Sequence, residues 1–325
     1  MKTWQIQRHG EPTTAIELVD TEIPEPEAAE VRIRVDAAAI GLPDVFMCRG
    51  TYAFRPELPF TPGQEVSGTV VAAGKDAKTA IGERVMAVTS FFRGFGGLAE
   101  EALALDAATH PAPSEMDSAE AACFVIPYHT AYIGLVTRGQ LQPGETLVVL
   151  GAAGGTGTAA VQLGCALGAR VIAVAAGPEK GELCRELGAE LVIDHRKSDI
   201  AEAIRDATAG KGANLIYDPV GGEACDAALH AIASEGRLLI IGFASGKFHD
   251  APSAVLIQKN ASMVGVYVGA YSKPFTSTVH EALLELWRDK KIRGVVSSRV
   301  GFDEAAVALE ELAGRRSVGK TIVYV

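Results

Sequence analysis

The spacing of apolar residues predicts short strands and turns in the first 120 or so residues. Val31–Ile40 places Val and Ile at alternate positions with Arg and Asp among them, which is the period of a half-buried strand. A second strand is expected at Gly68–Ala73. Gly, Pro and Asp cluster near residues 41–44, 59–63, 74–76 and 93–97, and no long amphipathic helix is visible. This part of the chain therefore predicts a compact β-rich domain.

After Ser118 the pattern becomes an alternation of apolar strands and helices. Glu120–Val136 has helical composition. The expected strands are Leu147–Leu150, Arg170–Val174, Leu191–Ile193, Ala213–Tyr217 and Arg237–Gly242. Helices are expected at Thr158–Leu167, Pro178–Leu187 and Ile200–Ala207. Alternation at this spacing predicts an α/β fold, a parallel sheet wrapped by helices.

The end of the chain adds three elements. An apolar strand is expected at Met263–Val268, a helix at Val279–Lys290 and a closing strand at Lys320–Val325. We expect these closing elements to return to the first domain, and we expect the apolar strand Met263–Val268 to pair with its copy in a homodimer.

Composition and charge exclude several classes of protein. The 325 residues fit two domains, and 48% hydrophobic with 22% charged residues describes a globular protein. The formal net charge is −10 and no Lys/Arg run interrupts the acidic balance, which argues against a nucleic-acid partner. The five cysteines never approach CxxC spacing, so we expect no disulfide framework and a cytoplasmic location.

A membrane location is not expected either. The N-terminus lacks the apolar stretch of a secretory signal. Leu147–Ala169 is uncharged and long enough to span a bilayer, but it contains six glycines. A buried strand, a turn and a buried helix explain this stretch better.

The glycine-rich turn at residues 151–157 is the first candidate binding site. It lies between an apolar strand and a helix, where glycines let the backbone approach a pyrophosphate that rests on the helix N-terminus. Ala152 departs from the usual glycine pattern, so the prediction depends on the strand and helix that flank the turn. The expected contacts are Gly154, Gly155, Thr156 and Gly157.

The end of the second strand decides between NADH and NADPH. An NAD site usually places an acid there to bind the ribose 2′-hydroxyl, but this chain has Ala176 and Gly177. Lys180 follows, and His195 and Arg196 come after the next strand. A cationic pocket of this kind suits a 2′-phosphate and favours NADPH, although Lys180 and Arg196 are also typical of solvated surface positions.

A series of motifs over nearly the whole chain resembles one family. The motifs are PGQEVSG (62–68), GGLAEEALA (96–104), YHTAY (128–132), GAAGGTGTAAVQLGCALGARV (151–171), YDPVGG (217–222), GRLLIIGFASG (236–246) and GVYVGAY (265–271). Together they resemble the zinc-free, zeta-crystallin-like quinone oxidoreductases of the medium-chain dehydrogenase/reductase superfamily. The resemblance implies a GroES-like catalytic domain (1–124 and 268–325), a Rossmann NADPH-binding domain (125–267) and an active site in the cleft.

The resemblance also places the positions at which zinc-dependent relatives bind their metal. These positions are Gly41, Gln64 and Ile126, and none offers a good zinc ligand. Cys48 and Cys123 are near in sequence, but each is more typical of a small core residue. We therefore expect no metal.

The resemblance further implies which residues serve catalysis. Many members of the family have Asn where Gly41 stands. Asp44 and Tyr52 match the pattern, and the Tyr52 hydroxyl is a candidate donor to the developing oxyanion, or a stacking residue. Thr130 matches a residue that contacts the nicotinamide amide or ribose. Its neighbour His129 is a candidate proton carrier, but a packed or solvated histidine is favoured.

The remaining cofactor contacts implied by the resemblance lie at the ends of later strands. They are Pro219 in the Asp218–Gly221 loop, then Phe243, Ala244 and Ser245, and, less firmly, Val266, Tyr267 and Lys320. The expected function is NADPH-dependent reduction of quinones or α,β-unsaturated carbonyl compounds without zinc. Two alternatives stay open: an enoyl-CoA reductase of the same fold and a non-catalytic NADPH-binding protein.

Overall fold

The protein is described by a computed structural model that covers residues 1–250, 252–315 and 317–325. The chain forms two compact units. The first consists of Met1–Ile126, Ser272–Ser277 and Gly294–Val325, and the second consists of Pro127–Tyr271 and Thr278–Arg293. Each unit is described in turn.

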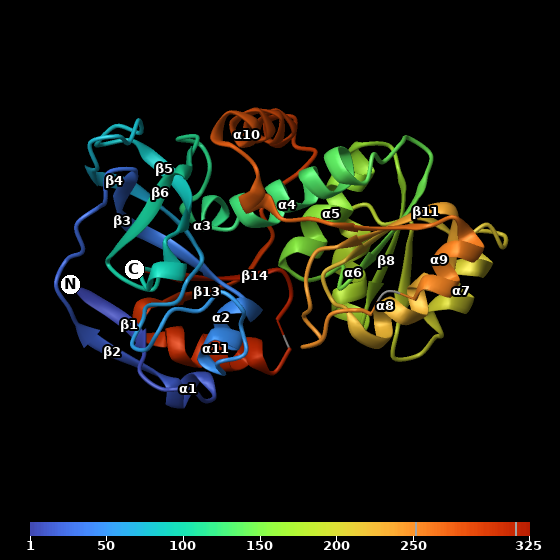
Figure 1. Ribbon diagram of the computed structural model, residues 1–325, viewed down its shortest axis with the longest axis horizontal. Coiled ribbons are helices and arrows are strands. Elements are labelled where there is room, and N and C mark those ends of the chain that lie inside the picture. Colours follow the sequence, from blue (N-terminus) through green and yellow to red (C-terminus); the bar gives the residue numbers. More distant parts are fainter. Residues whose placement is uncertain (251, 316) are drawn as a thin grey trace. The chain divides into compact units, whose positions relative to one another are not determined.

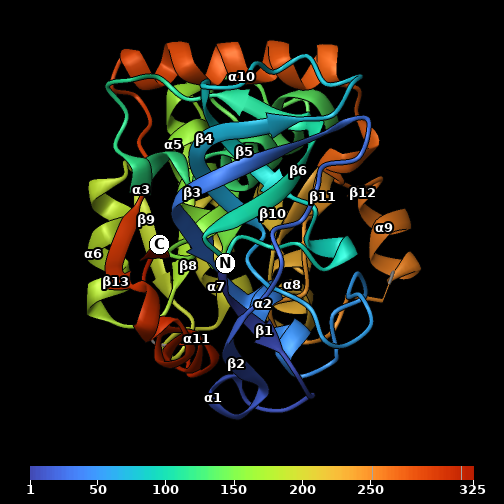
Figure 2. The same ribbon diagram turned by 90° about the vertical axis from the view of Figure 1, so that its left-hand side faces the viewer.

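The first unit is built on a six-stranded sheet and a two-stranded hairpin. In order across the large sheet, the strands are β13 (Val296–Gly301), β14 (Lys320–Tyr324), β3 (Glu30–Ile40), β4 (Glu65–Ala73), β5 (Arg84–Thr89) and β6 (Glu101–Pro111). The hairpin consists of β1 (Lys2–Ile6) and β2 (Ile16–Asp20). Because β3 also pairs with β6, strands β3 to β6 close on themselves; Figure 2 shows these strands facing the viewer.

Alternation along the strands explains the core of this unit. Val31, Ile33 and Val35 point into it and are almost fully buried, as the period of two in the sequence predicts. Strand β14 pairs antiparallel with β3, with Ile322 opposite Ala39. The closing strand β14 therefore belongs to the first unit, whereas Thr278–Arg293, which was also expected in the first domain, belongs to the second.

Short helices complete the first unit. They are α1 (Pro12–Ala15), α2 (Leu42–Cys48), α3 (Ser118–Ala121), α11 (Ala305–Ala313) and the 3-10 turns η1 (Phe91–Arg93) and η5 (Phe302–Glu304). Helix α11 packs against α1 and α2 and buries Ala305, Ala308, Leu309 and Leu312.

The second unit is a doubly wound parallel sheet. Its strands, in order, are β12 (Ser262–Gly265), β11 (Ile232–Ile240), β10 (Ala213–Asp218), β7 (Thr146–Leu150), β8 (Arg170–Ala175) and β9 (Leu191–Asp194). All of the pairings are parallel. The strand order reverses between β7 and β10, which is where open sheets of this type bind dinucleotides.

Helices cover this sheet, as Figure 1 shows for α5, α6, α8 and α9. The helices of the unit are η2 (Val125–His129), α4 (Thr130–Tyr132), η3 (Ile133–Arg138), α5 (Gly155–Ala166), α6 (Pro178–Glu186), α7 (Ile200–Ala207), α8 (Gly222–Leu229), α9 (Ser253–Lys259), η4 (Val268–Ala270) and α10 (Lys273–Arg288). The first residues of η2 and α10 belong to the first unit. The stretch Leu147–Ala169 forms β7, the turn and α5, and no helix in the described part of the chain is long and apolar enough to cross a membrane.

Some predicted boundaries are wrong for physical reasons. Strand β12 ends at Gly265 instead of Val268, because its neighbour β11 ends at Ile240, which is opposite Gly265. Helix α10 begins at Lys273, six residues before the predicted start, since Pro274 is tolerated in a first helical turn. The sequence reading also missed β13, whose half-polar sequence VSSRVG pairs parallel with β14.

Candidate cofactor site and catalytic residues

The glycine turn after β7 has the geometry that an anion requires. Gly151 has a φ of +57°, and a Cβ on Gly157 would lie 2.2 Å from the Gly151 carbonyl oxygen, so the turn is too tight for a side chain there. The N-cap residue of α5, Gly154, has no side-chain cap hydrogen bond. The first amides of α5 therefore point away from the helix without intrahelical acceptors, which is a ready anion site. Gly154, Gly155, Thr156 and Gly157 form the end of this turn and the start of α5, and their contact with a cofactor stays a prediction.

The carboxyl end of β8 carries the residues that were predicted to contact a 2′-phosphate. Gly177 has a φ of +84°, and a Cβ on it would meet nothing within 4 Å, so the space beside it is open. Lys180 lies in the first turn of α6. Burial lowers the pKa of Lys180, and the nearby Arg196 guanidinium lowers it further. Ala176, Gly177, Lys180 and Arg196 thus gather around one strand end, and exposed His195 precedes Arg196.

An acid reaches this strand end from the neighbouring strand, and the sequence reading missed it. Asp194 is the last residue of β9, and its Oδ2 accepts a hydrogen bond from the Gly177 amide at 3.3 Å. Its Oδ1 accepts one from the Arg196 amide at 3.1 Å. The signal was available, because the carboxyl ends of neighbouring parallel strands meet at one edge of a sheet.

Two loops that follow β10 and β11 are tied to each other. The Ala244 amide donates to the Pro219 carbonyl at 3.0 Å, and the Ser245 amide donates to the Val220 carbonyl at 2.8 Å. Asp218 Oδ1 shapes the first loop by accepting from the Val220 and Gly221 amides, both at 2.8 Å. The predicted contacts Pro219, Ala244 and Ser245 are therefore neighbours at the carboxyl edge of the sheet.

Three further predicted cofactor contacts follow strands β11 and β12 in the chain. The Phe243 ring packs on Phe248, with ring centroids 4.4 Å apart. The Val266 amide donates to the Ile240 carbonyl at 3.1 Å, which continues the β11–β12 ladder by one bond. Tyr267 is 64% exposed. Their cofactor contacts stay predictions.

Thr130 lies in an irregular helical stretch. It is buried and begins α4, between the π-helical turns η2 and η3. π-Helical turns are rare overall, and many of those that occur lie at functional sites. This distortion is therefore a signal for a functional site that composition alone does not carry.

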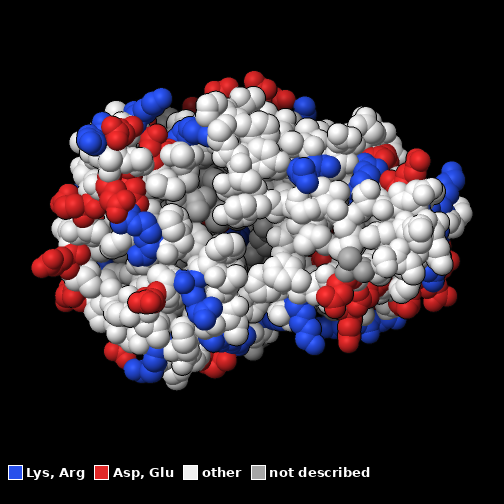
Figure 3. All heavy atoms as spheres, viewed as in Figure 1, with Lys and Arg blue, Asp and Glu red and all other residues white. Residues whose placement is uncertain are grey.

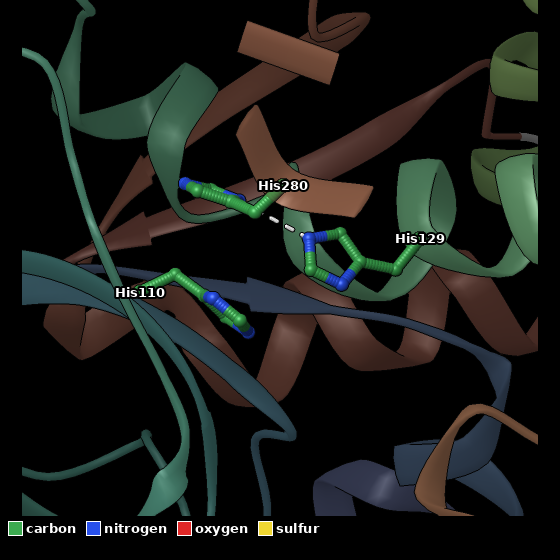
Figure 4. A group of neighbouring side chains, drawn as sticks. All are labelled: His110, His129 and His280. Atoms are coloured by element: carbon green, nitrogen blue, oxygen red, sulfur yellow. Dashed lines mark hydrogen bonds between the residues drawn. The ribbon is translucent and has the colours of Figure 1, made fainter. Parts of the chain in front are cut away.

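His129 is a packed histidine that pairs with His280. Its Nε2 lies 3.1 Å from His280 Nδ1, and both rings are buried (Figure 4; His110, also drawn, belongs to the first unit). Burial lowers the pKa of His129 to about 3, and His280 adds to this effect. The ring is therefore neutral near pH 7, which fits the favoured interpretation of a packed side chain better than that of a proton carrier.

Asp44 in the first unit joins two backbone segments. Its Oδ2 accepts a hydrogen bond from the Gly41 amide at 2.9 Å, closing a capping box at the start of α2. Its Oδ1 accepts one from the Gly63 amide at 2.8 Å, in the PGQEVSG turn. Burial raises the pKa of Asp44 to about 6, although the two hydrogen bonds lower it. With both oxygens engaged, Asp44 is placed to hold Gly41 and Gly63 in position.

A buried ion pair adjoins Asp44. Lys320 Nζ lies 2.9 Å from Glu65 Oε2, and Glu65 Oε1 accepts a hydrogen bond from the Ile126 amide at 2.7 Å. Burial alone would lower the pKa of Lys320, but the Glu65 carboxylate outweighs it and the pKa lies above its usual range. Lys320 belongs to the first unit, so its predicted cofactor contact stays a prediction.

The three positions aligned with zinc ligands surround this ion pair. A Cβ on Gly41 would lie 3.9 Å from Lys320 Nζ, and Ile126 contributes its backbone amide to Glu65. Gln64 is buried, and its Nε2 has no hydrogen-bond partner in the described part of the chain.

The neighbouring cysteines are poor metal ligands. Cys48 and Cys123 are fully buried, and burial raises the pKa of Cys48 to about 12 and that of Cys123 further. Metal binding requires the thiolate, which burial disfavours in both.

Tyr52 follows α2 in a half-buried position. Its ring packs edge-on against Phe54, with centroids 6.2 Å apart, and its carbonyl accepts a hydrogen bond from Arg55 at 2.9 Å. The hydrogen bond therefore holds the Tyr52 backbone, and the Phe54 ring contacts the Tyr52 side chain.

Comparison with known proteins bears on both units. Residues 27–114 match the alcohol dehydrogenase GroES-like domain family, and residues 155–287 match the zinc-binding dehydrogenase family. A quinone oxidoreductase-like protein 2 homolog from Nematostella vectensis is 38% identical over 301 residues, which cover 91% of this chain and 81% of that protein.

Solved structures show the same likeness over the full length. A probable oxidoreductase from Mycobacterium abscessus has a TM-score of 0.83 and 35% identity, and the match covers 100% of this chain and 99% of the other. A mycobacterial protein solved as a complex with NADPH has a TM-score of 0.92 and 27% identity over 100% of both chains. The chain belongs to the zinc-free quinone oxidoreductase branch of the medium-chain dehydrogenase/reductase superfamily. It is an oxidoreductase with a Rossmann sheet and a GroES-like β domain.

Proposed function

We propose that this protein reduces quinones or α,β-unsaturated carbonyl compounds with NADPH, by hydride transfer and without zinc. The observation that carries the proposal is the glycine turn at the start of α5, with cationic side chains at the ends of the neighbouring strands. The names of the relatives and the NADPH complex of the mycobacterial structure support the same reaction.

The second unit supplies the residues that fit the cofactor. The α5 amides at Gly155 and Thr156 suit the pyrophosphate, since an anion at a helix N-terminus is stabilised by unpaired N–H groups and the helix dipole. Lys180 and Arg196 suit the 2′-phosphate. When bound, NADPH supplies the hydride, and the protein orients it and excludes water.

The donor set supports a reaction without zinc. Gly41 and Ile126 have no side-chain donor atoms, and an amide such as that of Gln64 is a poor zinc ligand. Without a Lewis acid, an acceptor that delocalises the incoming charge over a conjugated oxygen is favoured over an isolated ketone. Tyr52 is the proposed hydrogen-bond donor to that oxygen, with Asp44 as a positioning residue and Thr130 as a contact to the nicotinamide end.

Two further properties complete the proposal. Strand β12 is at the edge of its sheet, and an open apolar edge favours pairing with a second copy, so we propose a homodimer. All five cysteines are unpaired with one another, which suits a reducing cytoplasm.

The test is steady-state NADPH oxidation with a panel of small quinones, enals, enoyl-CoA thioesters, simple ketones and secondary alcohols. Quinones or enals should be reduced readily, and ketones and alcohols should be poor substrates. Turnover restricted to enoyl-CoA would assign an enoyl-CoA reductase instead. Saturable NADPH binding with no turnover of any acceptor would favour a non-catalytic binding protein. Elemental analysis of the same sample should show far less than one zinc per chain.

A further inference from the structure

We infer that Asp194 is a selectivity residue that limits the preference for NADPH over NADH. Asp194 ends β9, and its carboxylate reaches the neighbouring end of β8, where the ribose 2′-position of the cofactor would bind. The inference rests on the proposed cofactor site and adds a residue whose charge repels the 2′-phosphate of NADPH.

The position of the carboxylate is determined by two neighbours. Its Oδ2 lies 3.3 Å from the Gly177 amide, and Gly177 is the residue at which the chain turns from β8 into α6. Its Oδ1 lies 3.1 Å from the Arg196 amide. Asp194 is therefore attached to the same backbone that carries Lys180 and Arg196, and it cannot move away without losing both hydrogen bonds.

The charge of Asp194 is only partly offset. Its nearest cation is Lys197, whose Nζ is 3.9 Å away and whose side chain is 77% exposed. This separation is longer than a hydrogen bond, and exposed pairs of this kind are weak. The hydrogen bond from the Arg196 amide lowers the pKa of Asp194, with smaller effects from Gly177 and Lys197. The carboxylate is therefore ionised near pH 7.

Opposite charges at one strand end determine how Asp194 changes the selectivity between NADPH and NADH. Lys180 and Arg196 attract a 2′-phosphate, which carries about −1.5 to −2 charges. Asp194 repels the same group, while a carboxylate at this edge is an acceptor for the 2′-hydroxyl of NADH. Selectivity arises from the repulsive contact as well as the attractive ones, so the site should accept both cofactors with a limited preference for NADPH.

The experiment measures the affinities of NADPH and NADH for the whole protein by nicotinamide fluorescence, without substrate. Asp194→Asn removes the charge and keeps one carbonyl acceptor, so it also loses one of the two backbone hydrogen bonds. The ratio Kd(NADH)/Kd(NADPH) should rise about two- to tenfold, and the rise should shrink at high salt. Lys197→Ala should move the ratio in the opposite direction. Glu190→Gln is the matched control, because Glu190 is an acid at the other end of β9 and bonds to Arg170.

The outcomes separate this inference from the proposed function. If the unchanged protein binds neither cofactor, the proposed function fails and the inference fails with it. If it binds NADPH but Asp194→Asn leaves the ratio unchanged, or weakens both cofactors equally, the inference alone is overturned and Asp194 is a structural link between β8 and β9. Thermal unfolding of each variant verifies that the affinities belong to folded protein.

Discussion

The two units place their charged side chains differently. The first unit buries Glu30, Asp44 and Glu65 to 1% exposure each. Each is engaged by specific partners: Ser90 and Arg93 bind Glu30, backbone amides bind Asp44, and Lys320 binds Glu65. In the second unit Asp218 is also buried to 1% exposure, but Lys180, Asp194 and Arg196 are partly or fully exposed near the ends of strands. Figure 3 shows acidic and basic side chains interspersed on the surface it draws.

We interpret the buried, paired charges as maintaining the fold and the strand-end cations as the proposed contacts to the cofactor. A buried ion contributes only while its partner is present, because an unpaired charge away from water is costly. A cation at a strand end keeps much of its hydration and can exchange water for a phosphate. We therefore expect removal of the Lys320 charge to lower the stability of the first unit, and removal of a strand-end cation to lower cofactor affinity in the second.

The largest effect is expected for Lys320→Ala. The change leaves Glu65 buried at 2% side-chain exposure without its cation, and removing one partner of a buried pair costs about 3–5 kcal/mol. Urea unfolding measures the loss, followed by tryptophan fluorescence in a Trp287→Phe background so that Trp4 reports on the first unit. Arg185→Ala in the second unit is the control, because both side chains of its pair with Glu182 are more than half exposed. A loss below about 1 kcal/mol for Lys320→Ala would contradict the comparison.

Tyr52→Phe tests whether the first unit also supplies chemistry. Loss of one transition-state hydrogen bond is expected to lower kcat about 10²–10³-fold, with the NADPH affinity and the unfolding midpoint unchanged. The measurement is turnover of a quinone at saturating NADPH. A decrease below about threefold would assign Tyr52 to stacking and leave solvent as the proton source.

Asp44 should make the stability of the first unit depend on pH. Its pKa rises from 3.8 to about 6 on folding, so the folded state binds this proton more tightly. The resulting stability is present below about pH 4 and is lost as the pH rises through 6, by at most about 3 kcal/mol. In urea titrations between pH 4 and 7, the difference in unfolding free energy between the unchanged protein and Asp44→Asn should therefore narrow as the pH rises. A constant difference would show that Asp44 has an ordinary pKa.

The smallest effect is expected for Lys180→Ala. NADPH affinity should fall by about 1–2 kcal/mol, the range for one charge-assisted contact, while NADH affinity and the unfolding midpoint stay nearly unchanged. Fluorescence titration with both cofactors measures this. Equal losses of affinity for NADH and NADPH would indicate that Lys180 stabilises the fold instead of binding the 2′-phosphate. The contrast between the two units would then weaken.

Local patterns predicted the second unit well because its structure is local. The apolar runs at Leu147–Leu150 and Arg170–Val174 each occupy a buried strand, and short turns join them to helices. The glycine turn was visible for the same reason: strand, turn and helix follow one another in the chain. Boundaries failed where a neighbouring strand set the length, as at β12.

The first unit shows what a sequence pattern cannot carry. Glu65 and Lys320 are 255 residues apart, and nothing near either one indicates the other. Likewise, the amide of Gly63 reaches Asp44 only after α2 and the PGQEVSG turn have folded together. Asp194 was missed because its position next to Gly177 depends on the order of strands in the sheet, which hydrophobic periodicity does not encode.

The pairing of β14 with β3 has a consequence for biosynthesis. A ribosome makes β3 to β6 early, but β14 follows the whole of the second unit in the chain. Until β14 emerges, β3 lacks one neighbour and Glu65 lacks Lys320. All six strands of the parallel sheet are complete before that point. The parallel sheet can therefore be completed while the sheet of the first unit still lacks its two last strands, β13 and β14.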